Sequence, residues 1–268
     1  MVAASSDDAR PRRLRLPRSR RLTIDVLHYH RQVPTCAHDR VMDLSRLSQL
    51  RAGLSQRISW SMLFIKAYGM VAAKFPVLRQ TYMPWPWPHV YQHPCSVAMV
   101  ATHREIDGEA WLFWSRFTRP EGQPLPRLQE FLDRYQHAPV PDVFQRQWQL
   151  SALPTPLRRV FWWWALNTSG VKRARRTGTF FLTTISAKGA EIQHPPAFLT
   201  ANMTFGPLDD RGRSRVTIAY DHRLMDGTLI ADCLADLETT LNEPIADELR
   251  ALAGVRHDVS PPAHRLSA

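Results

Sequence analysis

The chain has 268 residues, of which 44% are hydrophobic and 10% aromatic, so it can bury a packed core and is not a mostly disordered protein. Its 35 Lys and Arg exceed its 24 Asp and Glu by a formal net charge of +11. The excess is local, because residues 1–21 carry a net +5, residues 158–176 carry a net +6, and the remainder balances to zero. The charge therefore does not describe a basic protein body, and we expect no nucleic-acid partner.

Residues 1–21 are rich in Arg and Pro and lack hydrophobic periodicity, so we expect a flexible basic arm there. One domain is expected over residues 22–252, followed by a Pro-containing tail over 253–268. The three Cys are widely spaced and form no CxxC pair, which disfavours a disulfide framework or a zinc site. The sequence shows neither a secretory signal nor an apolar run of 18 residues, so we expect a cytoplasmic protein.

The first half of the domain alternates between strand-like and helix-like patterns. Residues 22–30 (LTIDVLHYH) alternate and predict a strand, which would place His28 and His30 on one face, although no third ligand suggests a metal site. Residues 36–47 predict a strand running into a helix, with Asp43 or Ser45 as the N-cap of that helix. The patterns that follow predict a helix over 59–75, a Pro and Trp turn over 84–90, and strands over 95–102 and 109–117.

The second half predicts a helix over 125–137, an irregular Pro-rich segment over 138–156 and a helix over 156–170. Three strands are expected over 178–186, 197–206 and 214–222, and an amphipathic helix over 229–244.

Three consecutive tryptophans, Trp162 to Trp164, lie within the helix expected over 156–170. Adjacent residues on a helix cannot all face one core, so at least one of these rings should be exposed or at an interface. A wall for a large apolar acyl chain or lipid acceptor, a membrane-surface contact, and packing between subunits are the three interpretations.

The most specific pattern is the octapeptide YDHRLMDG, which spans residues 220–227. His222 ends a strand-like run, and histidine is the side chain whose ordinary pKa suits general-base work near neutrality. Asp226 can fix the turn by pairing with an Arg, and Gly227 permits a backbone angle or a close approach that a Cβ would forbid.

The string DHRLMDG resembles the DHRxxDG signature of dihydrolipoamide acyltransferase catalytic domains, and chloramphenicol acetyltransferases share its shorter form, HxxxDG. Residues 33–51 resemble the strand-to-helix entry of that family, residues 59–79 its following helix, and residues 178–189 its GTFTvSNlG strand. The resemblance extends over roughly residues 22–250.

The resemblance implies an α/β fold, a chloramphenicol acetyltransferase-like two-layer sandwich with a mixed sheet and flanking helices. It also implies a homotrimer whose active sites lie between subunits. The acyl donor would be a CoA or lipoamide thioester, and no metal would be needed.

The resemblance also assigns roles to residues of this chain. The catalytic set would be His222 as general base, Thr183 as the hydroxyl that stabilises the oxyanion, with Thr184 or Ser186 as alternatives, and Asp226 as the residue that holds the His222 loop. Plausible ion-pair partners of Asp226 are Arg20, Arg21 and Arg31. Arg223 and Gly227 would be structural, and the residues that could bind the CoA phosphates and neighbouring groups are Lys172, Arg173, Arg175, Arg176 and Ser186.

Lipoyl and subunit-binding domains of a dehydrogenase complex would not fit into residues 1–21. The sequence therefore favours a stand-alone enzyme that transfers an acyl group from acyl-CoA to a hydroxyl, amine or thiol acceptor of unknown identity. One alternative is the acyltransferase core of a 2-oxoacid dehydrogenase-type complex that uses a separate lipoyl carrier. The other is a non-catalytic trimeric scaffold.

Overall fold

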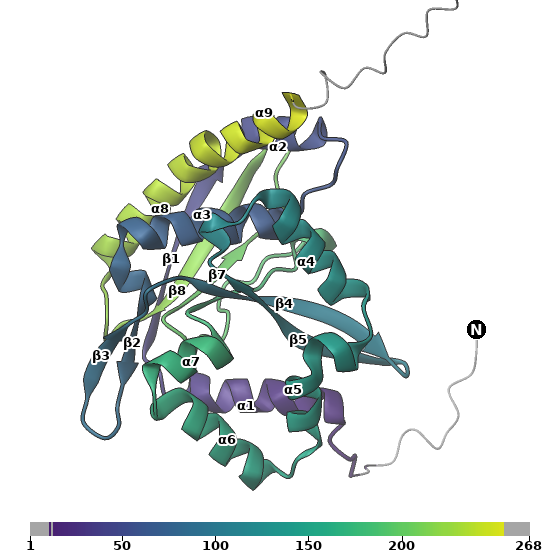
Figure 1. Cartoon of the computed structure of the whole chain (residues 1–268), viewed down its shortest axis with the longest axis vertical. Coiled ribbons are helices and arrows are strands. Elements are labelled where there is room, and N and C mark those ends of the chain that lie inside the picture. The colour runs from purple at the N-terminus through teal and green to yellow at the C-terminus, as the bar shows by residue number, and fades with distance from the viewer. Residues whose placement is uncertain (1–10, 12, 255–268) are drawn as a thin grey trace, which may run out of the picture.

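A six-stranded mixed sheet with helices packed against it forms the centre of the molecule (Figure 1). The computed structural model describes residue 11 and residues 13–254. The strand order is β1-β8-β7-β6-β4-β5, in which β6 runs parallel to both of its neighbours and every other pair is antiparallel. The expected α/β fold with a mixed sheet and flanking helices is confirmed.

The strands are β1 (Thr35–Asp43), β2 (Gln80–Met83), β3 (His89–Gln92), β4 (Val97–Ile106), β5 (Glu109–Thr118), β6 (Phe180–Leu182), β7 (Ala201–Phe205) and β8 (Arg213–Asp221). The helices are α1 (Arg21–His30), α2 (Ser45–Ala52), α3 (Trp60–Lys74), α4 (Leu125–His137), α5 (Val140–Ala152), α6 (Thr155–Asn167), α7 (Gly170–Thr177), α8 (Gly227–Thr240) and α9 (Ala246–Gly254). A π turn, Leu241–Ile245, joins α8 to α9, and β2 and β3 form a separate hairpin.

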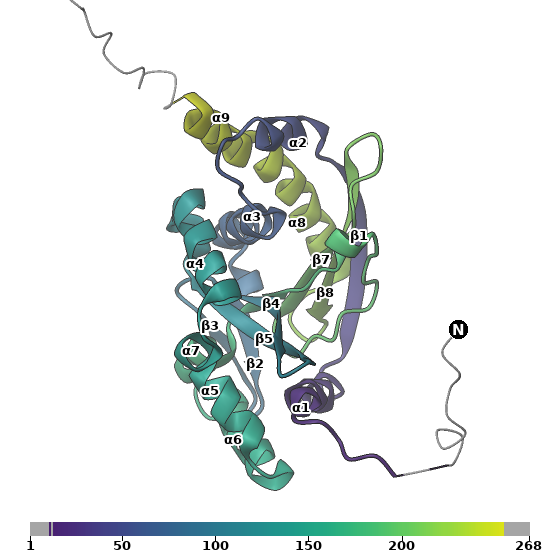
Figure 2. The same cartoon turned by 90° about the vertical axis from the view of Figure 1, so that its right-hand side faces the viewer.

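The main core lies between one face of the sheet and the helices α3, α4 and α8. Helix α3 is apolar almost all round, and its residues from Met62 to Tyr68 are buried. Alternating residues of the strands, such as Phe180 and Leu182, point into this core, whereas Phe181 points to the opposite face. That opposite face packs against α1 and α6, so helices flank the sheet on both sides (Figure 2).

The segment 22–30 is a helix, and the strand predicted there is wrong. Leu22, Val26 and Tyr29 are buried at the spacing of an α-helix, and they pack against Trp162 of α6. His28 and His30 lie about 200° apart around a helix, so they do not share a face.

The segment 138–156 is also misread from its prolines, because it holds α5 and the start of α6. Pro141 lies in the first turn of α5, and Pro156 lies in the first turn of α6. Proline has no N–H to lose at these positions, so it starts a helix rather than breaking it.

The predicted arm over 1–21 and tail over 253–268 lie mostly outside the described residues. Where the arm is described, Arg18–Arg20 form a short 3-10 turn, and the Arg18 side chain donates hydrogen bonds to Ser151 Oγ and to the Trp148 carbonyl. Among the described residues, no helix combines the length and the apolar composition needed to cross a bilayer.

Candidate active site

His222 immediately follows β8 and begins the turn that leads into α8. Its backbone N–H donates to the Pro34 carbonyl at 2.9 Å, which ties the turn to the start of β1. Its Nδ1 lies 2.8 Å from the Met225 carbonyl. Since a carbonyl can only accept, Nδ1 carries the ring proton and the unprotonated Nε2 is left as the base. Within residues 13–254 no hydrogen bond engages Nε2, and the side chain is exposed.

The residues on either side of His222 form an ion pair that shapes the turn. Arg223 donates from Nε and Nη2 to the two carboxylate oxygens of Asp221, at 2.8 and 2.6 Å. The Asp221 side chain is buried, and its Oδ1 also accepts the backbone N–H of Arg223. The Arg223 guanidinium stacks over the Tyr82 ring of β2, 4.3 Å from its centroid. This bidentate pair therefore fixes the main chain around His222.

Asp226 holds the turn in a different way from the predicted ion pair. Its Oδ1 accepts the backbone N–H of Leu229 at 3.2 Å, so Asp226 is the N-cap of α8. Among the described residues it makes no ion pair, and none of Arg20, Arg21 or Arg31 is its partner. A carboxylate at this position also interacts favourably with the positive end of the helix dipole.

Gly227 permits a close approach rather than an unusual backbone angle. A Cβ placed on Gly227 would lie 2.7 Å from Nε2 of His38, on the neighbouring strand β1. The His38 ring in turn lies 5.7 Å from the Tyr220 ring, and the Tyr220 ring lies 5.8 Å from that of His222. Tyr220 thus separates the two imidazoles, and burial raises the pKa of its phenol.

Thr183 follows the last residue of β6 and has a hydroxyl that engages no hydrogen bond within the described chain. The neighbouring alternative, Thr184, donates its hydroxyl to the Phe205 carbonyl at 2.8 Å and accepts the Ser186 N–H. Ser186 begins a 3-10 turn that ends at Lys188. Of the three predicted hydroxyl groups at this end of β6, that of Thr184 is therefore already hydrogen-bonded to backbone groups of the same chain.

The sheet register separates Thr183 from His222 within one chain. Thr183 follows Leu182, which pairs with Met203, and the next residue of β7, Thr204, pairs with Thr217 of β8. His222 lies five residues beyond Thr217, so two strand spacings and five residue steps put the two backbones about 19 Å apart. Thr183 and His222 of the same chain therefore cannot touch one reacting group.

The predicted phosphate-binding residues lie on α7, at the opposite end of β6 from Thr183 and Ser186. Arg173 is buried and donates to the carbonyls of Leu166 and Phe198, and burial lowers its pKa to about 10 while the Asp221 charge raises it. Its guanidinium is therefore occupied by the fold. Lys172 and Arg176 are exposed and lie over the Trp164 ring, 5.2 and 3.9 Å from its centroid, and Arg175 is also exposed.

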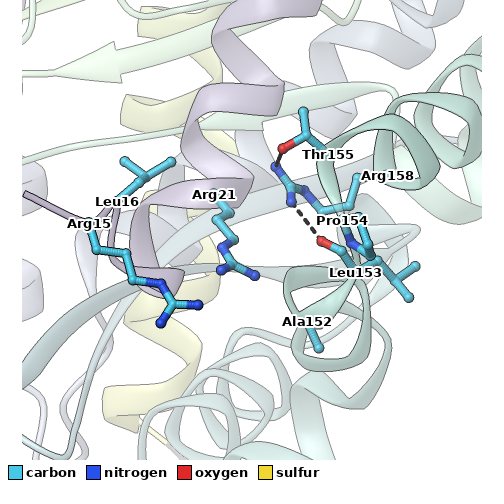
Figure 3. A pocket seen from close by; sticks show the side chains of 8 residues that line it. All are labelled: Arg15, Leu16, Arg21, Ala152, Leu153, Pro154, Thr155 and Arg158. Carbon is cyan, nitrogen blue, oxygen red and sulfur yellow. Dashed lines mark hydrogen bonds between the residues drawn. The ribbon is translucent and has the colours of Figure 1, made fainter.

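Two hollows lie near the His222 turn and near helix α6, and they differ in size. A small one of about 60 Å³ adjoins the His222 turn and is lined in part by Tyr82, Pro84, Asn167 and Arg223. A larger one of about 420 Å³ lies between the chain before α1 and the α5–α6 connection (Figure 3). Arg158 at its wall donates to the Leu153 carbonyl and to Thr155 Oγ1. The larger hollow is not lined by any residue of the His222 turn.

Comparison with solved structures identifies the fold. The chain is 14% identical to a probable dihydrolipoamide acetyltransferase from Listeria monocytogenes, with a TM-score of 0.62 over 87% of this chain and 95% of that one. It is 13% identical to the dihydrolipoamide acetyltransferase of Azotobacter vinelandii, with a TM-score of 0.62 over 94% of this chain and 98% of that one. A truncated catalytic core of the Thermoplasma acidophilum 2-oxoacid dehydrogenase complex matches with 13% identity and a TM-score of 0.62, over 87% and 99% of the chains.

No family model matches the chain, and no curated protein matches it in sequence. The chain therefore has the fold of dihydrolipoamide acetyltransferase catalytic cores, over nearly their whole length. The fold implied by the DHRLMDG resemblance is thereby confirmed.

Three features of the turn were missed from the sequence. Asp221 is the buried partner of Arg223, Pro34 supplies the acceptor for the His222 N–H, and His38 fills the space above Gly227. The alternation of acid and base in Asp221-His222-Arg223 was a signal for the first of these. The other two depend on β1 lying beside β8, which the sequence does not show.

Proposed function

We propose that this protein is an acyltransferase that moves an acyl group from a CoA thioester to a hydroxyl, amine or thiol acceptor. His222 is its general base, and Thr183 of a neighbouring subunit supplies the hydroxyl that stabilises the oxyanion. The observation that carries the proposal is the placement of His222 in an acyltransferase-core fold. Its Nδ1 is anchored to the Met225 carbonyl, and Nε2 is left unprotonated at the surface.

The proposed reaction follows from this placement. Nε2 of His222 removes the proton from the acceptor while the acceptor attacks the thioester carbonyl carbon. The carbonyl oxygen becomes an oxyanion, and a hydroxyl donor there lowers the barrier by roughly 3–4 kcal/mol, by analogy with other oxyanion donors. The intermediate collapses by breaking the carbon–sulfur bond, and the protonated imidazole returns its proton to the departing thiolate.

A site shared between subunits agrees with the distance between the two groups. His222 and Thr183 of one chain lie about 19 Å apart by strand register. A symmetric trimer with head-to-tail contacts repeats one interface, so it can bring His222 of each chain to Thr183 of the next. We therefore propose a homotrimer with three equivalent sites.

Lys172, Arg175 and Arg176 are the candidates for the phosphates of CoA. Their side chains are exposed and form no ion pair with a carboxylate among the described residues, so they can pair with phosphate oxygens. Arg173 is not included, because its guanidinium is buried and bonded to carbonyls. Ser186 stays a candidate near Thr183, at the far end of the strand.

The solved structures support acyl transfer in general and leave two donors to compare. The Azotobacter vinelandii protein is a dihydrolipoamide acetyltransferase whose catalytic mechanism was examined at a serine, a histidine and an asparagine four residues after it. In the present chain the residue four positions after His222 is Asp226. A lipoyl-linked donor is therefore the competing substrate.

The test is a panel of acyl-CoA and acyl-dihydrolipoamide thioesters, with thiol release measured in the presence of small alcohols, amines and thiols. We expect release of free CoA by the wild-type protein and a loss of about 10²- to 10⁴-fold in His222→Ala. His137→Ala is the matched control, because His137 is exposed and its Nδ1 also lies 2.8 Å from a backbone carbonyl.

Equal activity in wild type and His222→Ala would refute the role of His222. If the protein turned over acyl-dihydrolipoamide but not acyl-CoA, the proposed donor would be wrong, while acyl transfer as the reaction would stand. Failure of both thioesters, with the trimer intact, would favour the non-catalytic scaffold.

A further inference from the structure

Exposed apolar side chains gather at one end of the molecule. Among the described residues, nine of the fourteen large hydrophobic side chains that are exposed come from the β2–β3 hairpin, α6 and the start of α7. We call them the Trp face: Trp85, Trp87, Val90, Leu157, Val160, Phe161, Trp163, Trp164 and Val171. The other five are scattered along the chain, as single exposed hydrophobics usually are.

The hairpin and α6 form one continuous surface. The Trp85 ring meets the Trp163 ring edge to face at 6.1 Å. The hairpin also packs on α7, because a Cβ on Gly170 would lie within 2.2 Å of the Tyr91 ring. Figures 1 and 2 both place the hairpin, α6 and α7 at the end of the molecule opposite α2 and α9.

Helix α6 is apolar on its outer side as well as on its inner side. Arg158, Trp162 and Leu166 are buried on one side. Leu157, Val160, Phe161 and Trp164 follow the i, i+3, i+4, i+7 spacing on the other side, where Val160 is 64% exposed. A globular helix ordinarily presents polar residues to water, so this outer stripe indicates a surface that meets another apolar phase.

The charged side chains around the Trp face are cationic. Residues 80–92 and 155–177, which form the face and its surroundings, contain no Asp or Glu. Lys172 and Arg176 lie over the Trp164 ring, so their charges are at the edge of the apolar surface. Arg116 of β5 adds another cation, since it donates to the Arg175 carbonyl.

We propose that the Trp face binds the surface of an anionic membrane. Tryptophan rings at the level of the headgroups, with Lys and Arg beside them, are the side chains that peripheral proteins use at an anionic bilayer. A second copy presenting the same face would bring like charges together, which disfavours symmetric pairing through it. The proposal goes beyond acyl transfer. It shares Lys172 and Arg176 with the proposed CoA site, but vesicle binding is measured without CoA, so either proposal can fail without the other.

The test measures binding of the full chain to vesicles of phosphatidylcholine alone and of phosphatidylcholine with added phosphatidylglycerol. We expect binding to the anionic vesicles, weakened by salt, and quenching of tryptophan fluorescence by lipids brominated on their acyl chains. Trp87→Ser combined with Phe161→Ser should lower the partition coefficient at least about tenfold, and so should Lys172→Gln combined with Arg176→Gln.

Matched controls come from α4, where the Arg127 guanidinium lies over the exposed Phe131 ring, 5.5 Å from its centroid. Phe131→Ser and Arg127→Gln should leave vesicle binding unchanged, and so should His222→Ala. The wild-type quenching and salt dependence test the proposal even where a variant does not fold.

Absence of wild-type binding to anionic vesicles would overturn the proposal. So would equal losses in the α4 controls. A third overturning result would be a change in oligomeric state, with vesicle binding intact, in the Trp87 and Phe161 variant, because that would assign the face to contacts between copies.

Discussion

At the scale of single residues, the His222 turn has a separate anchor on each side of the imidazole. Asp221 and Arg223 form a bidentate pair, Asp226 caps α8, and the Met225 carbonyl fixes the ring proton on Nδ1. These contacts are local, and each could have been suspected from residue spacing in the motif. The contact between His38 and Gly227 is different, because it depends on a neighbouring strand.

Gly227→Ala tests that contact. The new Cβ would displace the His38 ring, while alanine is favoured over glycine in a helix by up to about 1 kcal/mol. We expect little net change in the free energy of unfolding in the wild-type background, because the cost of moving the exposed His38 ring offsets the gain from alanine. In a His38→Ala background the same substitution should stabilise by up to about 1 kcal/mol. Urea unfolding of the four proteins measures the coupling, and a coupling of zero would contradict the contact.

His93 predicts the direction of a pH effect on stability. Burial and the Arg173 charge lower its pKa to about 4 from an ordinary value of 6.5. The unfolded chain therefore binds the proton more tightly, so His93 stabilises the fold fully above pH 6.5, and this contribution is lost as the pH falls towards 4.

The full loss is roughly 3.5 kcal/mol, because the pKa falls from 6.5 to about 4 and each pKa unit corresponds to about 1.4 kcal/mol; about 2 kcal/mol of it falls between pH 7 and pH 5. Urea midpoints at pH 7 and pH 5 measure it, and His93→Gln should show a smaller decrease between these two pH values. An identical decrease in both proteins would assign the acid sensitivity to other groups.

At the scale of elements, α1 and α6 are joined by a buried ion pair. Arg158 is 2% exposed and donates from Nε to Asp25 at 2.7 Å, and Arg159 reaches the same carboxylate at 3.1 Å. Two of the six cations in the basic segment over 158–176 thus neutralise one buried acid. The Tyr29 hydroxyl adds a hydrogen bond to the Arg159 carbonyl.

Arg158→Met should destabilise the fold by about 3–5 kcal/mol, because it leaves the Asp25 carboxylate buried with only the less buried Arg159 as its partner. Arg158→Met combined with Asp25→Leu should recover much of that loss, since two apolar side chains of similar volume need no partner. Chemical unfolding measures both. If the double variant were less stable than the single one, the buried charge would not be the cause.

Elements with one dominant pattern could be predicted from the sequence, and those with two competing patterns could not. Helix α3 and strand β5 match their predicted ranges closely because their periodicity is unambiguous, whereas β4 extends to Ile106, four residues beyond its predicted end. The α1 sequence satisfies both a strand-like alternation and the helical spacing of Leu22, Val26 and Tyr29, and only packing against α6 decides between them. Helix α5 was missed because a proline in the first turn looks like a breaker in sequence.

The candidate site also has one part that could be predicted from the sequence and one part that could not. His222, Asp226 and Gly227 lie in one short motif, and the sequence was sufficient to place them in one turn. Thr183 was expected inside a strand over 178–186, but β6 ends at Leu182, so Thr183 lies just after it. The distance between Thr183 and His222 follows from the order of β6, β7 and β8. The order of strands is a property of the whole sheet, so it cannot be predicted from the residue pattern of any one segment.

At the scale of the whole molecule, the proposed site between subunits predicts complementation between inactive variants. His222→Ala and Thr183→Ala should each be inactive or nearly so. Refolded together in equal amounts, they should regain about one quarter of wild-type activity, because one interface in four combines an intact His222 with an intact Thr183. Thiol release before and after mixing measures the recovery. Mixtures that stay inactive, although both variants form trimers, would contradict a site built from these two residues.

The separation of about 19 Å between Thr183 and His222 has a consequence for how the protein would behave at low concentration. A lone chain would hold one half of each of two different sites and complete neither of them. Specific activity would then fall on dilution, at the concentration where the subunits dissociate, while the fold of each chain stayed intact. The amount of enzyme in a cell would set not only how many sites exist but whether any site exists at all.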